Sequence, residues 1–228
     1  GGVVVLSGEA GIGKSTTFAK FCAEARSQGA RVLVGKCSDR EGAPAFWPWT
    51  QILRTLLVET SESEFAHELA AIVPEFAESE QASEGPDRFR LFETTVEVLR
   101  SAAESAPLVI GIEDLHWADT PSLMVLQFLV QGIAADRILV LATCRDLDLE
   151  IAHPLRRTLG EIVSQGHGRR LAIEGLGEGE VRDFLEGILG TPARRAPSES
   201  TGPADRAQSR RGRPSLSGER RPPAERPA

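Results

Sequence analysis

Gly8-Glu9-Ala10-Gly11-Ile12-Gly13-Lys14-Ser15 is the stretch that decides the fold of this chain. It follows the apolar run Val3-Val4-Val5-Leu6 and precedes the helix-like segment Thr16-Thr17-Phe18-Ala19-Lys20-Phe21-Cys22. The stretch fits the pattern Gly-x4-Gly-Lys-Ser/Thr, in the order of strand, loop and helix that a phosphate-binding loop requires. In a chain of this length the pattern arises by chance at roughly the one per cent level. We therefore interpret it as a binding loop for nucleotide phosphates.

The residue types of this loop suit a triphosphate. Glycines let backbone N–H groups turn toward phosphate oxygens without a Cβ in the way. Lys14 would reach the β- and γ-phosphates, Ser15 would place its hydroxyl on Mg²⁺, and the helix that begins near Lys14 points its positive dipole end at the same oxygens. The residues assigned to nucleotide binding are Gly8, Glu9, Ala10, Gly11, Ile12, Gly13, Lys14, Ser15 and Thr16.

Two adjacent carboxylates, Glu113 and Asp114, follow a later hydrophobic run over residues 107–112. Strand residues alternate between faces, so at the end of a central parallel strand one carboxylate can face a metal and its neighbour a water at the γ-phosphate. An acidic strand end is the partner with which P-loop NTPases hold Mg²⁺. The sequence leaves open which of the two carboxylates has which role.

Three further apolar runs predict strands over residues 31–37, 137–142 and 170–173. Helical patterns predict helices over residues 14–27, 61–73, 87–105, 122–132, 153–165 and 178–189, and one more that begins at residue 46. Their start signals include a capping box at Ser61-Glu62-Ser63-Glu64 and a cap at Asp119-Thr120-Pro121. The alternation of strands and helices predicts an α/β fold with a mainly parallel sheet, in which residues 46–105 form a helical insertion.

Aromatic and apolar residues of the insertion indicate packing. Five of them recur at helical spacing and are expected to face the core: Phe89, Phe92, Val96, Leu99 and Ala103. Trp47 and Trp49 are interpreted as core or docking contacts, and His116 as a turn or interface residue.

The strand over residues 137–142 runs into Thr143 and Arg145. In the additional-strand class of P-loop proteins, one strand lies between the strand that leads to the lysine and the strand that ends in the acids. The end of that strand points at the γ-phosphate, so Thr143 and Arg145 are candidate phosphate sensors. The alternative for Arg145 is a surface salt bridge.

The composition of the C-terminal segment indicates where the folded domain ends. Segment 191–228 holds nine arginines against four acids, seven of the 14 prolines and a single large apolar residue, Leu216. Such a segment cannot bury enough surface to offset its ordering entropy, so we expect a folded domain over residues 1–190 and a disordered Arg/Pro-rich tail. The tail carries a charge of +5, so residues 1–190 carry −12 within the net charge of −7, and this acidic body argues against direct nucleic-acid binding by the chain.

Cysteine usage and hydropathy indicate location. The three cysteines show neither disulfide nor zinc-site spacing, which suits a reducing cytoplasm. Since no apolar run approaches the roughly 20 residues that span a bilayer, we expect a cytoplasmic protein with no membrane partner. The chain opens on a strand without Met, so we expect a piece of a longer protein.

Four segments together resemble STAND-type AAA ATPase domains, which occur in large bacterial LuxR-type and SARP-type regulators and beside adenylate cyclase or kinase modules. They are the phosphate loop, Gly42-Ala43-Pro44-Ala45-Phe46-Trp47-Pro48-Trp49, Ile112-Glu113-Asp114-Leu115-His116-Trp117-Ala118-Asp119 and Ala142-Thr143-Cys144-Arg145-Asp146. The resemblance covers about residues 1–190. It implies a three-layer P-loop NTPase fold with a five-stranded sheet of the additional-strand class.

The resemblance also assigns roles. Glu113 stands where the family has its Mg²⁺-associated acid, Asp114 where it has the water-polarising acid and Arg145 where it has a sensor arginine. The implied catalytic residues are Asp114, Glu113, Lys14 and Arg145, and the implied metal ligands are Ser15 and Glu113. The family's adenine-clasping box and helical lid are not found, so the resemblance is to a domain truncated at both ends.

The implied function is a Mg²⁺-ATP-binding signal-transduction ATPase with slow hydrolysis. Its expected partners are ATP and ADP and the regulatory or effector domains of a larger parent protein, and the resemblance allows a nucleotide-dependent oligomer. The alternative is a nucleotide-binding interaction module that does not hydrolyse ATP. A chain that itself binds DNA is a weaker alternative, because no helix-turn-helix pattern is found in the sequence.

Overall fold

The computed structural model describes residues 1–40, 42–60, 65–76, 88–145 and 154–189. The chain divides into two compact units, Gly1–Leu176 and Gly177–Ala228, and the second unit contains helix α7 (Glu178–Leu189). The predicted domain boundary at residue 190 therefore stays a prediction. The predicted capping box at 61–64 and the tail at 191–228 lie outside the described residues.

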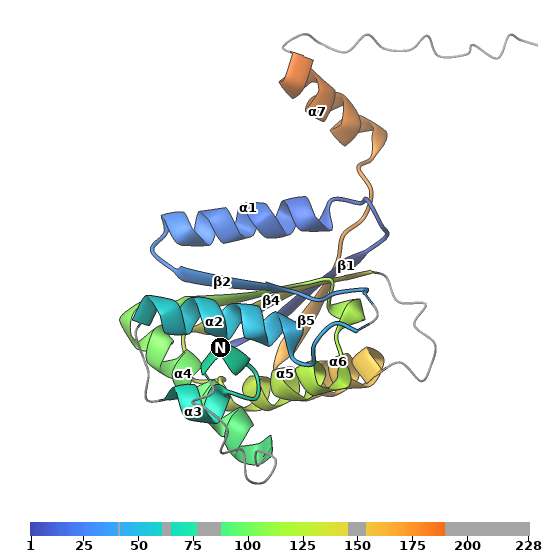
Figure 1. Ribbon diagram of the computed structural model, residues 1–228. Helices are drawn as coiled ribbons and strands as arrows, with labels where there is room; N and C mark the ends of the chain where they lie inside the picture. The colour runs from blue at the N-terminus through green and yellow to red at the C-terminus, as the bar shows by residue number, and fades with distance from the viewer. Residues whose placement is uncertain (41, 61–64, 77–87, 146–153, 190–228) are drawn as a thin grey trace, which may run out of the picture. The chain divides into compact units, whose positions relative to one another are not determined.

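The first unit is built on one five-stranded sheet (Figure 1). Its strands are β1 (Gly2–Gly8), β2 (Arg31–Lys36), β3 (Leu108–Glu113), β4 (Ile138–Arg145) and β5 (Gly168–Ala172). They lie in the order β2-β3-β4-β1-β5, and all four pairings are parallel. Strand β4 therefore separates the strand that leads to the phosphate loop from the strand that ends in the acids, which confirms the predicted fold class.

Helices cover both faces of this sheet. Figure 1 shows α1 (Lys14–Ser27) on one face, and α2 (Trp47–Thr60), α4 (Arg88–Ser105), α5 (Thr120–Gly132) and α6 (Pro154–Ser164) on the other. The short elements are α3 (Ala66–Leu69) and the 3-10 turns η2 (Pro74–Phe76) and η3 (Leu115–Trp117). We call the first face the α1 face and the second the α5 face.

The two faces bury different cores. On the α5 face a large cluster includes Val5, Ile110 and Val140, whereas the α1 face buries the smaller group Leu6, Phe18, Cys22 and Leu141. Successive strand residues belong to different clusters, as the two-residue period of a strand requires. This alternation fixes the face to which each strand residue points.

The predicted cap at the start of α5 is confirmed. The side chain of Asp119 caps α5 by accepting a hydrogen bond from the Ser122 N–H at 2.8 Å. Trp49 is fully buried and its indole N–H donates to the Ser122 carbonyl at 2.9 Å, so it is a core residue that joins α2 to α5.

One packing prediction is wrong. Phe89 does not face the core: its side chain is 58% exposed and meets the ring of Phe128 edge-on at 5.7 Å. It lies in the first turn of α4, where Leu91 is the residue that enters the core, while the other four residues of the predicted stripe are buried. In the part of the chain that the structure describes, no helix is long and apolar enough to cross a membrane.

Candidate functional site

Lys14 lies in the first turn of α1 and its side chain folds back over the glycine loop. Its Nζ donates to the Gly8 carbonyl at 2.8 Å and to the Glu9 carbonyl at 2.6 Å. The residue is only 9% exposed. The loop therefore wraps around an ammonium group whose two carbonyl partners come from the start of the loop itself.

Glycine is required at two positions of this loop for different reasons. A Cβ at Gly8 would stand 2.7 Å from the Ile173 carbonyl oxygen, so the backbones of β1 and the segment after β5 approach too closely for a side chain. Gly13 precedes α1 with φ 107°, a left-handed conformation that glycine adopts readily, and a Cβ there would meet nothing within 4 Å. The space beside the loop backbone at Gly13 is thus open.

The start of α1 has the character of an anion site. Gly13 is the residue before the helix and makes no side-chain cap, and the first turn contains no acid. The first N–H groups of a helix have no partner within the helix, and they carry the positive end of its dipole. Ser15 and Thr16 are exposed there, as are Glu9, Ala10 and Gly11 of the loop, while Ile12 is half-buried. Phosphate oxygens fit such a donor set.

Glu113 points to the α1 face of the sheet. A Cβ at Gly111 would stand 2.5 Å from the ring of Phe18 in α1, so position 111 faces α1, whereas Ile110 and Ile112 belong to the core of the α5 face. By the two-residue period, Glu113 faces α1 as well. Burial raises the pKa of the Cys22 thiol in α1; the charge of Arg26 opposes this rise, and the charge of Glu113 adds to it.

The Glu113 side chain is therefore on the same face as Lys14. In the parallel register Ile112 lies opposite Ala142, and Val5 on the next strand also lies opposite Ala142, so the ends of β3 and β1 are two strand spacings apart. Two spacings amount to about 10 Å.

Asp114 leaves the strand in a different direction. Its backbone is left-handed, with φ 56° and ψ 42°, a conformation in which Asp is several-fold enriched among non-glycine residues. Its N–H donates to the Thr143 hydroxyl at 3.0 Å, and its carboxylate pairs with the Lys36 ammonium at 3.3 Å. The two adjacent acids are thus distinguished by backbone geometry, which the sequence did not reveal.

The structure places Thr143 and Arg145 on the α1 face at the end of β4. Thr143 is 1% exposed and its hydroxyl accepts from Asp114, so it braces the acid turn. Arg145 is exposed and lies level with Gly8 in the register of β4 and β1. Arg145 therefore lies level with the start of the loop, whereas Thr143 is buried and lies opposite Leu6, two residues before the loop.

The buried Cys37 thiol is not a reactive cysteine. Burial, assisted by the charges of Asp119 and Asp114, raises the pKa of the Cys37 thiol to about 12. Since the thiolate is the reactive form, Cys37 is inert at neutral pH. Within the described residues, no group of three His, Cys, Asp or Glu side chains could hold a metal ion, and Mg²⁺ is commonly held by one or two carboxylates plus substrate phosphates.

Two residues of this region were missed by the sequence analysis, Lys36 and Gln51. Lys36 ends β2 beside β3 and pairs with Asp114. Gln51 of α2 accepts from the Lys36 N–H at 3.3 Å and donates to the Lys36 carbonyl at 3.0 Å. A charged residue at the carboxyl end of a predicted buried strand was the available signal for Lys36, whereas the contact of Gln51 depends on how α2 packs.

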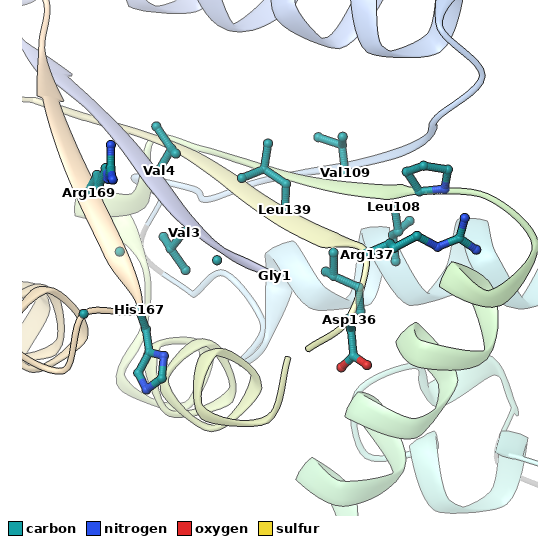
Figure 2. A pocket seen from close by; sticks show the side chains of 15 residues that line it. Gly1, Val3, Val4, Leu108, Val109, Asp136, Arg137, Leu139, His167 and Arg169 are labelled. Carbon is teal, nitrogen blue, oxygen red and sulfur yellow. The ribbon is translucent and has the colours of Figure 1, made fainter. Parts of the chain in front are cut away.

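A separate cavity lies at the opposite end of the strands. It is an open cavity of about 840 Å³ at the amino ends of β1, β3, β4 and β5, and Figure 2 shows Val4, Leu139 and Val109 pointing to the same side of the sheet there. Ligands of open α/β sheets bind outside the carboxyl ends of the strands. The candidate site is therefore the region of the loop and the acids and does not include this cavity.

A parallel sheet of this strand order, with a glycine loop from β1 into α1 and carboxylates after β3, defines the P-loop NTPase class. The family model described as AAA ATPase domain matches residues 1–141, more than half of the chain. The chain belongs to this family. Comparison with curated proteins gave no match.

Several solved structures have a similar fold. A STAND protein with a tetratricopeptide repeat sensor from Pyrococcus horikoshii is 16% identical, with a TM-score of 0.46, 84% of this chain covered and 24% of that chain. AMPPCP-bound DnaA from Aquifex aeolicus is 14% identical, with a TM-score of 0.42 and coverages of 84% and 47%. Drosophila ORC bound to GC-rich DNA and Cdc6 is 12% identical, with a TM-score of 0.43 and coverages of 84% and 59%. The chain thus spans between a quarter and three fifths of these proteins.

Proposed function

We propose that this chain is the Mg²⁺-ATP-binding domain of a bacterial signal-transduction ATPase of the STAND type. Bound nucleotide sets the contacts of attached regulatory or effector domains, and slow hydrolysis resets them. The observation that carries this proposal is the presence of Lys14 and Glu113 on one face of the sheet, about two strand spacings apart, beside the uncapped start of α1.

Different residues of the chain have different roles in nucleotide binding. Lys14 holds the loop closed on the Gly8 and Glu9 carbonyls and neutralises phosphate charge when its ammonium turns to the nucleotide. The first-turn N–H groups of α1 and the hydroxyl of Ser15 face the same oxygens. Positioning and electrostatics supply nearly all of the catalysis in phosphoryl transfer, so these fixed donors are the main catalytic resource.

The two acids then take different roles. Glu113 points to the α1 face and is the proposed metal-side carboxylate, together with Ser15. Asp114 is the proposed acid that orients the attacking water, and Arg145 at the end of β4 is the proposed γ-phosphate sensor. Mg²⁺, when bound, would supply charge neutralisation between the β- and γ-phosphates.

The proposal also includes a cellular location and a set of partners. A cytoplasmic location matches the buried thiols Cys22, Cys37 and Cys144. ATP, ADP and the other domains of a larger parent protein are the proposed partners, with a nucleotide-dependent oligomer as a further one.

Titration calorimetry with ATP in Mg²⁺ buffer tests the binding step. Lys14→Ala should weaken ATP binding by about 10- to 100-fold, since a hydrogen bond to a charged group contributes about 1.5–3 kcal/mol. Lys20→Ala, which removes an exposed lysine from the same helix, is the matched control and should bind like the parent. Equal ATP affinity of Lys14→Ala and the parent would refute the proposal.

Phosphate release tests the hydrolytic step separately. Asp114→Asn should lower the rate of phosphate release while ATP still binds. If the parent binds ATP but releases no phosphate above background, the chain is a nucleotide-dependent interaction module, and the hydrolytic part of the proposal is wrong.

A further inference from the structure

Arg170 of β5 forms a hydrogen bond with the residue that comes directly before the phosphate loop. Its Nε donates to the Ser7 hydroxyl oxygen at 2.8 Å. Ser7 is fully buried, whereas Arg170 is exposed, and the two residues are 163 positions apart in the chain. The bond therefore ties the start of the loop to an edge strand of the sheet.

This hydrogen bond lies on the α5 face of the sheet. Arg170 is opposite Val5 in the register of β5 and β1, and Val5 belongs to the core of the α5 face. Ser7 is two residues beyond Val5, so by the two-residue period it points to that face as well. Lys14 begins the helix on the other face, so Arg170 reaches the start of the loop from the side opposite to the ammonium group.

The main chain after β5 holds Ser7 at a second point. The Ile173 N–H donates to the Ser7 carbonyl at 2.7 Å. The Ile173 carbonyl oxygen also lies so close to Gly8 that a Cβ there would stand 2.7 Å away from it. The main chain of Ser7 is thus held by Ile173, and its side chain by Arg170.

These contacts lead to the ammonium group of Lys14. The next carbonyl along the chain, that of Gly8, accepts a hydrogen bond from Lys14 Nζ at 2.8 Å. Because Gly8 is covalently bonded to Ser7, a change in the orientation of Ser7 moves this carbonyl and the ammonium group that it holds. Arg170 and Lys14 are therefore connected through two residues, Ser7 and Gly8.

We propose that Arg170 is a positioning residue for nucleotide binding, which acts through Ser7 on the phosphate loop. This inference rests on the proposed function, because it concerns the same site. Arg170 keeps the start of the loop in the conformation that accepts phosphate, and without it the loop also adopts other conformations. A protein whose binding-competent conformation is only partly populated binds its ligand with an affinity reduced by that fraction.

The expected effect is on affinity and not on turnover. A partly buried hydrogen bond from a charged donor corresponds to about a three- to tenfold change in an equilibrium. In titration calorimetry with ATP in Mg²⁺ buffer, Arg170→Met should therefore raise Kd about three- to tenfold. The kcat for phosphate release at saturating ATP should stay at the parent value, because bound ATP restores the competent loop. Arg170→Lys should recover part of the affinity, since it keeps a charged donor on a long side chain.

Arg169→Met is the matched control for the loss of charge. Arg169 is exposed and lies opposite Val4, which packs against the core of the α1 face, so Arg169 points to that face. The exchange removes the same charge from the other face of the same strand. Arg169→Met should therefore bind ATP like the parent.

A double-mutant cycle tests whether the effect passes through Ser7. Ser7→Ala removes only the hydroxyl and should weaken ATP binding by a similar factor. In that background, Arg170→Met should cause no further loss, because the two side chains act as one contact. Urea denaturation without nucleotide measures the separate effect on folding. A purely structural contact would lower the unfolding midpoint and leave the Kd of the folded protein unchanged.

The outcomes keep this inference distinct from the proposed function. If Arg170→Met or Ser7→Ala binds ATP with the parent's Kd while Lys14→Ala does not, the inference is wrong and the proposed function stands. If Arg169→Met weakens binding as much, or if Arg170→Met weakens it further in the Ser7→Ala background, the effect does not act through Ser7 and the inference is overturned. If the parent does not bind ATP, neither the proposed function nor this inference holds.

Discussion

The hydroxyl of Thr143 provides the sharpest test of how the acid turn is held. Thr143 is 1% exposed and accepts the Asp114 N–H at 3.0 Å, at a residue whose backbone is left-handed. Thr143→Val keeps the shape of the side chain but removes the acceptor. A donor left without its partner in a buried setting costs about 1–3 kcal/mol, and because this bond is only partly buried we expect about 1–2 kcal/mol.

Urea denaturation without nucleotide measures this loss. With a slope of about 2–3 kcal/mol per molar urea, the unfolding midpoint should fall by about 0.5 M. Thr143→Ser retains the hydroxyl and is the matched control, so it should recover most of the difference. Hydrogen exchange at the Asp114 amide should become faster in Thr143→Val and stay slow in Thr143→Ser.

The result that would refute the reasoning is a Thr143→Val protein with the parent's midpoint and unchanged exchange at Asp114. In that case the hydroxyl does not brace the acid turn. If, in addition, Thr143→Val loses only the stabilisation that ATP confers, the side chain acts as a phosphate sensor, which was the role predicted from the sequence.

Two further predictions concern packing and pH. Gly111→Val places a Cβ 2.5 Å from the ring of Phe18. We expect the unfolding free energy to fall by about 1–3 kcal/mol, and ATP binding to weaken because α1 is displaced. A thermal melt measures the first effect and an ATP titration the second, and a variant as stable as the parent would show that α1 does not pack on position 111. Burial, with Asp119 and Asp114, raises the pKa of Cys37 from its usual 9.0 to about 12, so the folded thiol keeps its proton when the unfolded thiol has lost it. The unfolding free energy should therefore be unaffected below pH 9 and fall between about pH 9 and 12, and Cys37→Ala should show a shallower fall; equal slopes would contradict the burial of this thiol.

Much of the fold, including the position of the glycine loop between β1 and α1, followed from local sequence. Hydrophobic runs predicted all five strands to within a few residues, and the Asp119 cap and the glycine loop predicted where α5 and α1 begin. Such signals are readable because each depends on residues within one turn or one strand. The stripe on α4 shows the limit: periodicity placed Phe89 with the buried residues, but how far the core extends along a helix depends on its neighbours.

The acid half of the site was decided by tertiary structure. Two adjacent carboxylates look equivalent in the sequence, and only the alternation of β3 and the left-handed backbone at Asp114 separate their directions. The partners of Asp114 come from β2 and β4, far away along the chain, and Gln51 reaches Lys36 only because α2 packs beside the sheet edge. The residues of the phosphate loop are neighbours in the chain, so the sequence determined that loop, whereas the surroundings of the acids arise from strands that meet only when the sheet is assembled.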